Sequence, residues 1–170
     1  MKIYNIRDYG ARICDTLQTE IIQKAIDDCF LAGGGRVVIP CGVYVTGGLR
    51  IRSGVELYLE TGAILKGSRK AEDYFGYLED KIEPVVQETV DNTRSETSAS
   101  AVATSRWCNA LIRGLDAHDF AIIGEKGSYI DGCNAYDPEG EHNYRGVHGI
   151  GIWRCRNMRF EGYTFLNSGN

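Results

Sequence analysis

The chain has 170 residues, of which 43% are hydrophobic, 25% are charged and only 3 are proline, a composition typical of a globular protein and not of a disordered or fibrous one. The net charge is -4, from 19 basic and 23 acidic residues, which argues against nucleic acid as a partner. Apolar runs are far shorter than the roughly 20 residues that cross a bilayer, and charge appears as early as Lys2. We therefore expect no membrane span, no secretory signal and a cytoplasmic location.

Residues 15–32 are predicted to form a helix. Asp15 is placed to cap its first turn with Gln18 as the capping-box partner, and Gly33 is placed to end it in the left-handed conformation. Its apolar residues recur at steps of three and four and form one stripe: Leu17, Ile21, Ile22, Ala25, Ile26 and Cys29. We interpret this helix as a packing element.

Short strands are predicted after the helix. Residues 36–40 are rich in β-branched side chains and lie between glycines and Pro40, which favours a buried strand. Residues 42–47 and 55–59 alternate apolar and polar side chains with period two. The Gly33-Gly34-Gly35 run lies between helix and strand, the reverse of the order that holds a phosphate at a helix N-terminus.

The strongest internal signal is a repeat. The segment 53–67 aligns without gaps with the segment 118–132, and a weaker copy at 156–162 aligns with the start of the second copy at a shorter offset. Repeats of one supersecondary unit indicate a solenoid. A coil of three short strands requires roughly 20 to 25 residues, so the offsets contain insertions, which we place in loops at 70–105 and 133–147. Unrelated strands in a β-sandwich are the alternative.

The first coil of a solenoid must be closed, because it would otherwise expose strand edges and core side chains. We assign this role to residues 1–35 as a capping segment that contains the predicted helix. The six cysteines include no Cys-x-x-Cys pair, the spacing typical of zinc and redox motifs. We therefore expect no metal and no cofactor.

No catalytic constellation is recognisable. Glycosidases need two carboxylates that flank the scissile bond, but the acidic candidates are each more simply explained as solvated or turn residues; they are Asp27, Asp28, Asp131, Asp137, Glu139 and Glu141. Arg154, Arg156 and Arg159 are interpreted as outward-facing strand residues. Arg145 and His148, in the second loop, are retained as candidate substrate contacts.

A set of short segments that together cover nearly the whole chain forms a specific pattern: Asp8-Tyr9-Gly10-Ala11, Asp15-Thr16, residues 22–27, residues 33–40, Gly42-Val43-Tyr44, Thr46-Gly47, residues 60–68, Asp73-Tyr74 and Tyr129-Ile130-Asp131-Gly132. In this order, the segments resemble the N-terminal part of polygalacturonase-like enzymes, glycoside hydrolase family 28 of the pectate-lyase-like superfamily. The resemblance implies an all-β protein, a right-handed parallel β-helix with an N-terminal capping α-helix, as one domain over residues 1–170. It also implies inverting hydrolysis of galacturonosyl linkages in pectic polysaccharide or oligogalacturonide.

The family's catalytic signatures, Asn-Thr-Asp, Asp-Asp, His-Gly and Arg-x-Lys, are expected downstream of Asn170, so no catalytic residue is assigned within the chain. Residues 163–170 resemble the coil that precedes those signatures. We therefore expect a C-terminally incomplete solenoid that is inactive alone and self-associates through its open coil. The alternatives are a non-catalytic binding or attachment module, and a rhamnogalacturonan hydrolase or lyase on the same scaffold.

Overall fold

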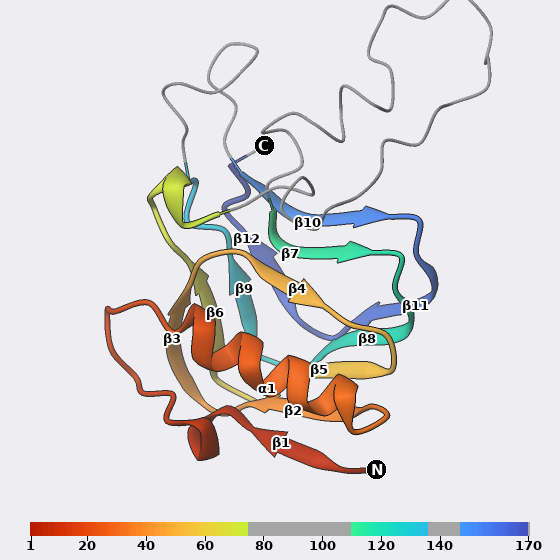
Figure 1. Ribbon diagram of the computed structural model, residues 1–170. Coiled ribbons are helices and arrows are strands. Elements are labelled where there is room, and N and C mark those ends of the chain that lie inside the picture. The colour runs from red at the N-terminus through yellow and green to blue at the C-terminus, as the bar shows by residue number, and fades with distance from the viewer. Residues whose placement is uncertain (75–109, 136–146, 170) are drawn as a thin grey trace, which may run out of the picture.

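The computed structural model describes residues 1–74, 110–135 and 147–169, which wind into three parallel sheets (Figure 1). Sheet A contains, in order, β1 (Ile3–Asn5), β2 (Gly35–Ile39), β5 (Val55–Leu59), β8 (His118–Gly124) and β11 (Arg156–Glu161). Sheet B contains β3 (Gly42–Thr46), β6 (Ala63–Gly67), β9 (Tyr129–Asp131) and β12 (Thr164–Leu166). Sheet C contains β4 (Leu49–Ile51), β7 (Ala110–Leu115) and β10 (His148–Trp153). The predicted parallel β-helix is confirmed.

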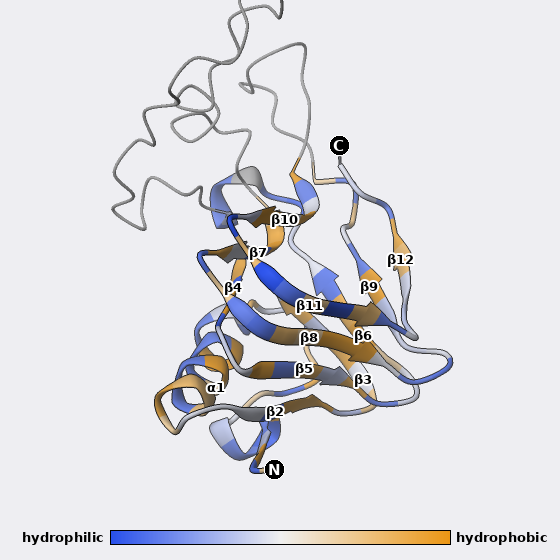
Figure 2. Ribbon diagram, turned by 90° about the vertical axis from the view of Figure 1, so that its right-hand side faces the viewer, coloured by the Kyte–Doolittle hydropathy of each residue, from blue (hydrophilic) through white to orange (hydrophobic). Residues whose placement is uncertain are grey.

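The offsets of the sequence repeat are the offsets at which strands of successive coils pair. Leu57 on β5 pairs with Ile122 on β8, the residue with which the repeat aligns it, and Ile64 on β6 pairs with Tyr129 on β9 at the same offset. The shorter offset of the weaker copy is the register between β8 and β11. Between β2 and β5 the register step is shorter still, because no insertion lengthens that coil. Figure 2 shows the strands of sheet A lying one above another.

The core is formed by the side chains that point inward, which alternate along each strand with side chains that point outward. Val37, Leu57 and Ile122 occupy equivalent positions on successive strands of sheet A, and all three are fully buried. Phe160 continues this column on β11 and is 39% exposed. One face of every strand thus contributes to a single apolar interior, because successive side chains of a strand point to opposite faces.

The helix α1 (Thr19–Leu31) begins later than the sequence predicted. Asp15 does not cap it. Gln18 stands at the N-cap position without a side-chain capping bond; its amide instead accepts a hydrogen bond from the Arg12 backbone N–H at 3.1 Å and donates to the Thr16 carbonyl at 3.1 Å. The predicted end is confirmed, since Gly33 has φ +89° and the Gly34 N–H donates to the Cys29 carbonyl at 2.9 Å.

The same helix covers the free edge of β4, as Figure 1 shows. The Gln23 amide accepts from the Arg50 N–H at 2.8 Å and donates to the Arg50 carbonyl at 3.1 Å. Thr19 Oγ1 accepts from the Gly47 N–H at 2.7 Å. The apolar side of the helix joins the core through Ile22, Ala25, Ile26 and Cys29. The predicted capping helix is confirmed, because it replaces both the hydrogen bonds and the apolar contacts of a missing strand.

Two further elements complete the N-terminal coil. β1 extends sheet A below β2, and Cys14 forms a parallel bridge with Tyr44 of β3 in sheet B. Between them lies the 3-10 helix η1 (Ile6–Tyr9). The first coil therefore follows the three-sided path of the later coils, with α1 in the place of a sheet C strand.

The chain passes from sheet B to sheet C after β6 and after β9, and the two loops predicted at 70–105 and 133–147 fall at these two passages. Most of 70–105 and of 133–147 lies outside the described residues. The first insertion begins with the 3-10 helix η2 (Ala71–Asp73) and the buried Tyr74, whose hydroxyl donates to the Ser68 carbonyl at 2.6 Å. In the described part of the chain, no helix is long and apolar enough to span a membrane.

Candidate functional site

Of the two predicted substrate contacts, the structure describes only His148. Arg145 lies outside the described residues. His148 is the first residue of β10 and not part of a loop, which corrects its predicted position. It lines an open pocket of about 300 Å³ together with Gly149, Tyr163 and Phe165. The assignment of both residues as substrate contacts stays a prediction.

The acidic candidates that the structure describes are engaged in contacts that hold the fold. Asp27 receives a hydrogen bond from Arg52 Nε at 2.9 Å, and Asp28 pairs with Lys24 at 3.1 Å. Asp27-Asp28 is an Asp-Asp pair like the family's signature, but it lies on the capping helix. Asp131 accepts hydrogen bonds from the Cys133 N–H at 2.9 Å and from Asn167 Nδ2 at 2.8 Å. Asp137, Glu139 and Glu141 are outside the described residues.

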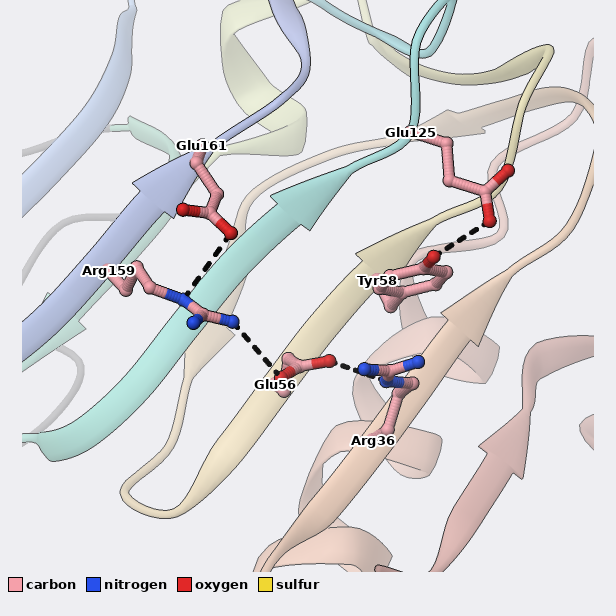
Figure 3. A network of polar contacts seen from close by, with 6 residues as sticks. All are labelled: Arg36, Glu56, Tyr58, Glu125, Arg159 and Glu161. Carbon is pink, nitrogen blue, oxygen red and sulfur yellow. Dashed lines mark hydrogen bonds and ion pairs between the residues drawn. The ribbon is translucent and has the colours of Figure 1, made fainter.

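Sequence reasoning missed a row of charged side chains on the outer face of sheet A, which we call the ion row: Arg36, Glu56, Arg159 and Glu161 (Figure 3). Arg36 Nε lies 2.5 Å from Glu56 Oε1, and Arg159 Nη2 lies 3.9 Å from Glu56 Oε2. Arg159 is two strands away from Glu56, with Ala121 of β8 between them in register. Because alanine is short, the arginine can reach across β8 to the glutamate.

A second cluster lies beside the ion row. The Arg36 guanidinium lies 4.0 Å from the centre of the Tyr58 ring, and the Tyr58 hydroxyl donates to Glu125 Oε1 at 2.7 Å (Figure 3). The Thr61 hydroxyl and backbone N–H donate to Glu125 Oε2 at 2.6 and 2.8 Å. These hydrogen bonds lower the pKa of Glu125 to about 2, and the bonds donated by the Thr61 hydroxyl and by Tyr58 contribute most to this shift.

This chemistry does not suit acid catalysis. The general acid of a glycosidase must keep its proton near the working pH, whereas Glu125 is ionised well into the acid range. The carboxylate instead ties β5 to the turn after β8, and Glu56 lies between the guanidinium groups of Arg36 and Arg159. Among the described residues, no group of three or more His, Cys, Asp and Glu side chains could hold a metal ion. We interpret both clusters as braces between coils.

The Glu125 brace predicts an acid-sensitive contribution to stability. Because its folded-state pKa is lowered, this contribution is present above the unfolded-state pKa, near 4.5, and is lost as the pH falls towards 2. The free energy of unfolding, measured with urea at several pH values, should fall as the pH is lowered through this range. The fall should be smaller in Glu125→Gln than in the wild type. Glu60→Gln, at the repeat-related position, is the matched control. Equal pH dependence of the wild type and Glu125→Gln would contradict the assignment.

Comparison with known proteins adds sequence evidence to this geometry. No family model matches the chain. It is 47% identical over 74 residues to the exo-poly-alpha-D-galacturonosidase of Dickeya chrysanthemi, a match covering 43% of this chain and 12% of that protein. The chain resembles part of a polygalacturonase. A polygalacturonase of Ralstonia solanacearum is 30% identical over 108 residues, which cover 61% of this chain and 17% of its own length. The matched segment thus spans less than a fifth of each relative.

Solved structures agree on the fold. The family 28 exopolygalacturonase of Yersinia enterocolitica superimposes with a TM-score of 0.67 at 23% identity, covering 98% of this chain and 35% of that one. An iota-carrageenase in complex with iota-carrageenan fragments has a TM-score of 0.63 at 17% identity, covering 97% of this chain and 29% of that one. Such low identities show the parallel β-helix alone.

Proposed function

We propose that the chain is the N-terminal scaffold of a polygalacturonase that hydrolyses galacturonosyl linkages of pectic polysaccharide with inversion. The observation that carries this proposal is the 47% identity over 74 residues to an exo-poly-alpha-D-galacturonosidase. The fold by itself does not choose the substrate, because a fold can host several activities and an iota-carrageenase shares it. The much higher sequence identity to a galacturonosidase favours pectic substrates over other polysaccharides.

In this proposal, residues 1–170 contribute the scaffold, the cap and one wall of the substrate cleft. The catalytic carboxylates are supplied by residues downstream of Asn170. Arg145 and His148 contact the carboxylates of the galacturonate units, since cationic side chains suit such groups. The described carboxylates support this division, because Asp27, Asp131 and Glu125 are all held in structural contacts.

Two measurements test the proposal. The purified 170-residue chain should release no reducing ends from polygalacturonate. A chimaera in which residues 1–170 replace the matching coils of the Dickeya chrysanthemi enzyme should fold and release reducing ends from polygalacturonate. Reducing-end release by the chain alone would overturn the assignment of the catalytic groups. A folded chimaera without activity on polygalacturonate would overturn the proposed scaffold role.

The chimaera also tests His148. Replacing this residue with alanine should raise the KM for oligogalacturonides, because it lines the pocket at β10. His118→Ala is the matched control, since His118 is also partly exposed but lies at the start of β8 and pairs with Asp119 at 2.7 Å. Equal effects of the two replacements would remove His148 from the substrate site.

A further inference from the structure

An open pocket of about 400 Å³ lies on the outer face of sheet A, over the first residues of β2, β5, β8 and β11. Its volume falls within the range of about 300–1,000 Å³ that is typical of small-molecule sites. Figure 3 shows two of its lining residues, Glu56 and Arg159, on this outer face at either side of β8. A further coil would lie beside β11 and extend this face without covering it, so the pocket is not a product of the chain end.

The floor of the pocket is formed by residues with little or no side chain. Gly34 and Gly54 line it, and Ala121 of β8 adds only a methyl group. The Gly54 carbonyl accepts a hydrogen bond from the Gly35 N–H at 3.0 Å, so these backbone polar groups are already satisfied. The floor is therefore flat and largely apolar.

One side of the rim supplies hydrogen-bond donors. The Arg159 side chain is 59% exposed, and its nitrogens lie 3.9 Å from Glu56 Oε2 and 3.7 Å from Glu161 Oε1. Both separations exceed the usual N–H···O hydrogen-bond length of about 2.7–3.2 Å. These two ion pairs thus orient the guanidinium and leave its N–H donors available to a ligand.

The other side of the rim supplies acceptors. Asp119 and Asn157 occupy the same bend in successive coils, with φ +55° and +54°, and Asn157 Nδ2 donates to Asp119 Oδ1. His118 Nδ1 lies 2.7 Å from Asp119 Oδ2. An ionised carboxylate can accept about four hydrogen bonds, so these two contacts hold the Asp119 side chain in place and leave it able to accept more.

The charges of the rim favour an uncharged ligand. The carboxylates of Glu56 and Asp119 line the pocket together with the guanidinium of Arg159, and Arg36 Nε lies 2.5 Å from Glu56 Oε1. An anionic ligand would lie beside both carboxylates, and a cationic ligand would lie beside the guanidinium. A ligand of either sign would therefore meet a like charge, which costs free energy.

A hexopyranose ring matches both parts of the pocket. Its C–H faces suit the flat apolar floor. Its hydroxyl groups, each of which both donates and accepts hydrogen bonds, suit a rim that mixes donors and acceptors. A galacturonosyl unit whose carboxyl group is methyl-esterified is such a ring without a charge. The choice of a pectic sugar among the hexoses rests on the proposed function.

We propose that the outer face of sheet A holds a non-catalytic binding site for a methyl-esterified galacturonosyl unit of a pectic chain. The sugar ring lies on the floor at Ala121, and its hydroxyl groups bind Asp119 and Arg159.

Saturation-transfer NMR with methyl-esterified trigalacturonate and the 170-residue chain tests the site. The method records the ligand and tolerates large protein assemblies. Transfer to the ester should saturate with concentration, and the same oligomer with free carboxylates should bind about threefold or more weakly. Absence of transfer to the ester would overturn the site. Equal or tighter binding of the acid form would overturn the assignment of an uncharged ligand.

Two variants locate the binding. Asp119→Gly removes the acceptor from a left-handed position that glycine adopts freely, and should raise the Kd about tenfold or more. Asp116→Gly is the matched control, because Asp116 also has a positive φ, +49°, and pairs with Arg154 of the next coil but does not line the pocket. Ala121→Leu fills the floor without removing a polar group, and should abolish binding.

Circular dichroism checks that each variant keeps the fold. Similar losses of affinity in Asp119→Gly and Asp116→Gly, or unchanged binding in Ala121→Leu, would place the sugar elsewhere and refute the inference. The chimaera separates this inference from the proposed function. An active chimaera with no sugar bound at this pocket would overturn the inference alone, whereas binding here with an inactive chimaera would overturn the scaffold role alone.

Discussion

Replacing Leu57 with alanine is expected to lower the free energy of unfolding by about 2–5 kcal/mol. Leu57 is fully buried in the middle of sheet A, paired with Val37 of β2 and Ile122 of β8. The interior of the solenoid stacks one inward layer on the next, so a shortened side chain leaves a space with strands on both sides. These strands are fixed by parallel pairing and cannot collapse into the cavity, which is the condition for a large loss.

Urea denaturation followed by circular dichroism measures this loss. Leu31→Ala is the matched control, because Leu31 is the same residue type but is 78% exposed at the end of α1, and its truncation should change stability by less than about 0.5 kcal/mol. Similar losses in the two variants would mean that the interior of the coil is not the main source of stability.

The fold was predictable because two independent patterns in the sequence agree. The period-two alternation of 55–59 assigns an inward face, and the internal repeat aligns the same inward positions of the next coil. The structure pairs Leu57 with Ile122, as that alignment requires. A strand shifted by a single position would turn its apolar side chains outward, so the apolar pattern fixes the register.

Other elements were not predictable from local patterns. β1 is very short and its Ile3 is exposed, so no alternation marks it as a strand; it is defined by pairing with β2. The helix was predicted to begin too early because Leu17 fits the apolar stripe. In the structure Gln18 and Thr19 are engaged by Arg12 and Gly47, and these tertiary contacts set where the helix begins.

The braces between coils illustrate what the repeat could have revealed. The first repeat offset aligns Glu56 of β5 with Ala121 of β8, and the second aligns Ala121 with Arg159 of β11. The alignment therefore already placed a short residue between two opposite charges, which is the arrangement found in the ion row. The contacts of Glu125 with Tyr58 and Thr61 depend on the path of a turn, and register alone does not specify that path. Arg145 belongs to an insertion for which the repeat provides no template.

Replacing Gly34 with alanine is expected to cost about 2–5 kcal/mol, whereas the same change at Gly33 should cost only about 1 kcal/mol. Both residues have left-handed backbone conformations, with φ +99° and +89°, so both alanines suffer similar backbone strain. They differ in the space available. A Cβ on Gly34 would lie 2.5 Å from the Gly54 carbonyl oxygen of the next coil, while a Cβ on Gly33 would have nothing within 4 Å.

The Gly54 oxygen cannot yield easily, because it accepts a hydrogen bond from the Gly35 N–H at 3.0 Å and the Gly54 N–H in turn donates to the His118 carbonyl at 3.1 Å. Relieving the collision would separate the first coil from the second where α1 passes into β2. Urea unfolding of the two single variants measures the difference directly, since the shared backbone strain cancels. If the two losses are equal, close approach of the coils is not what requires glycine at position 34, and the backbone conformation alone explains the glycine run.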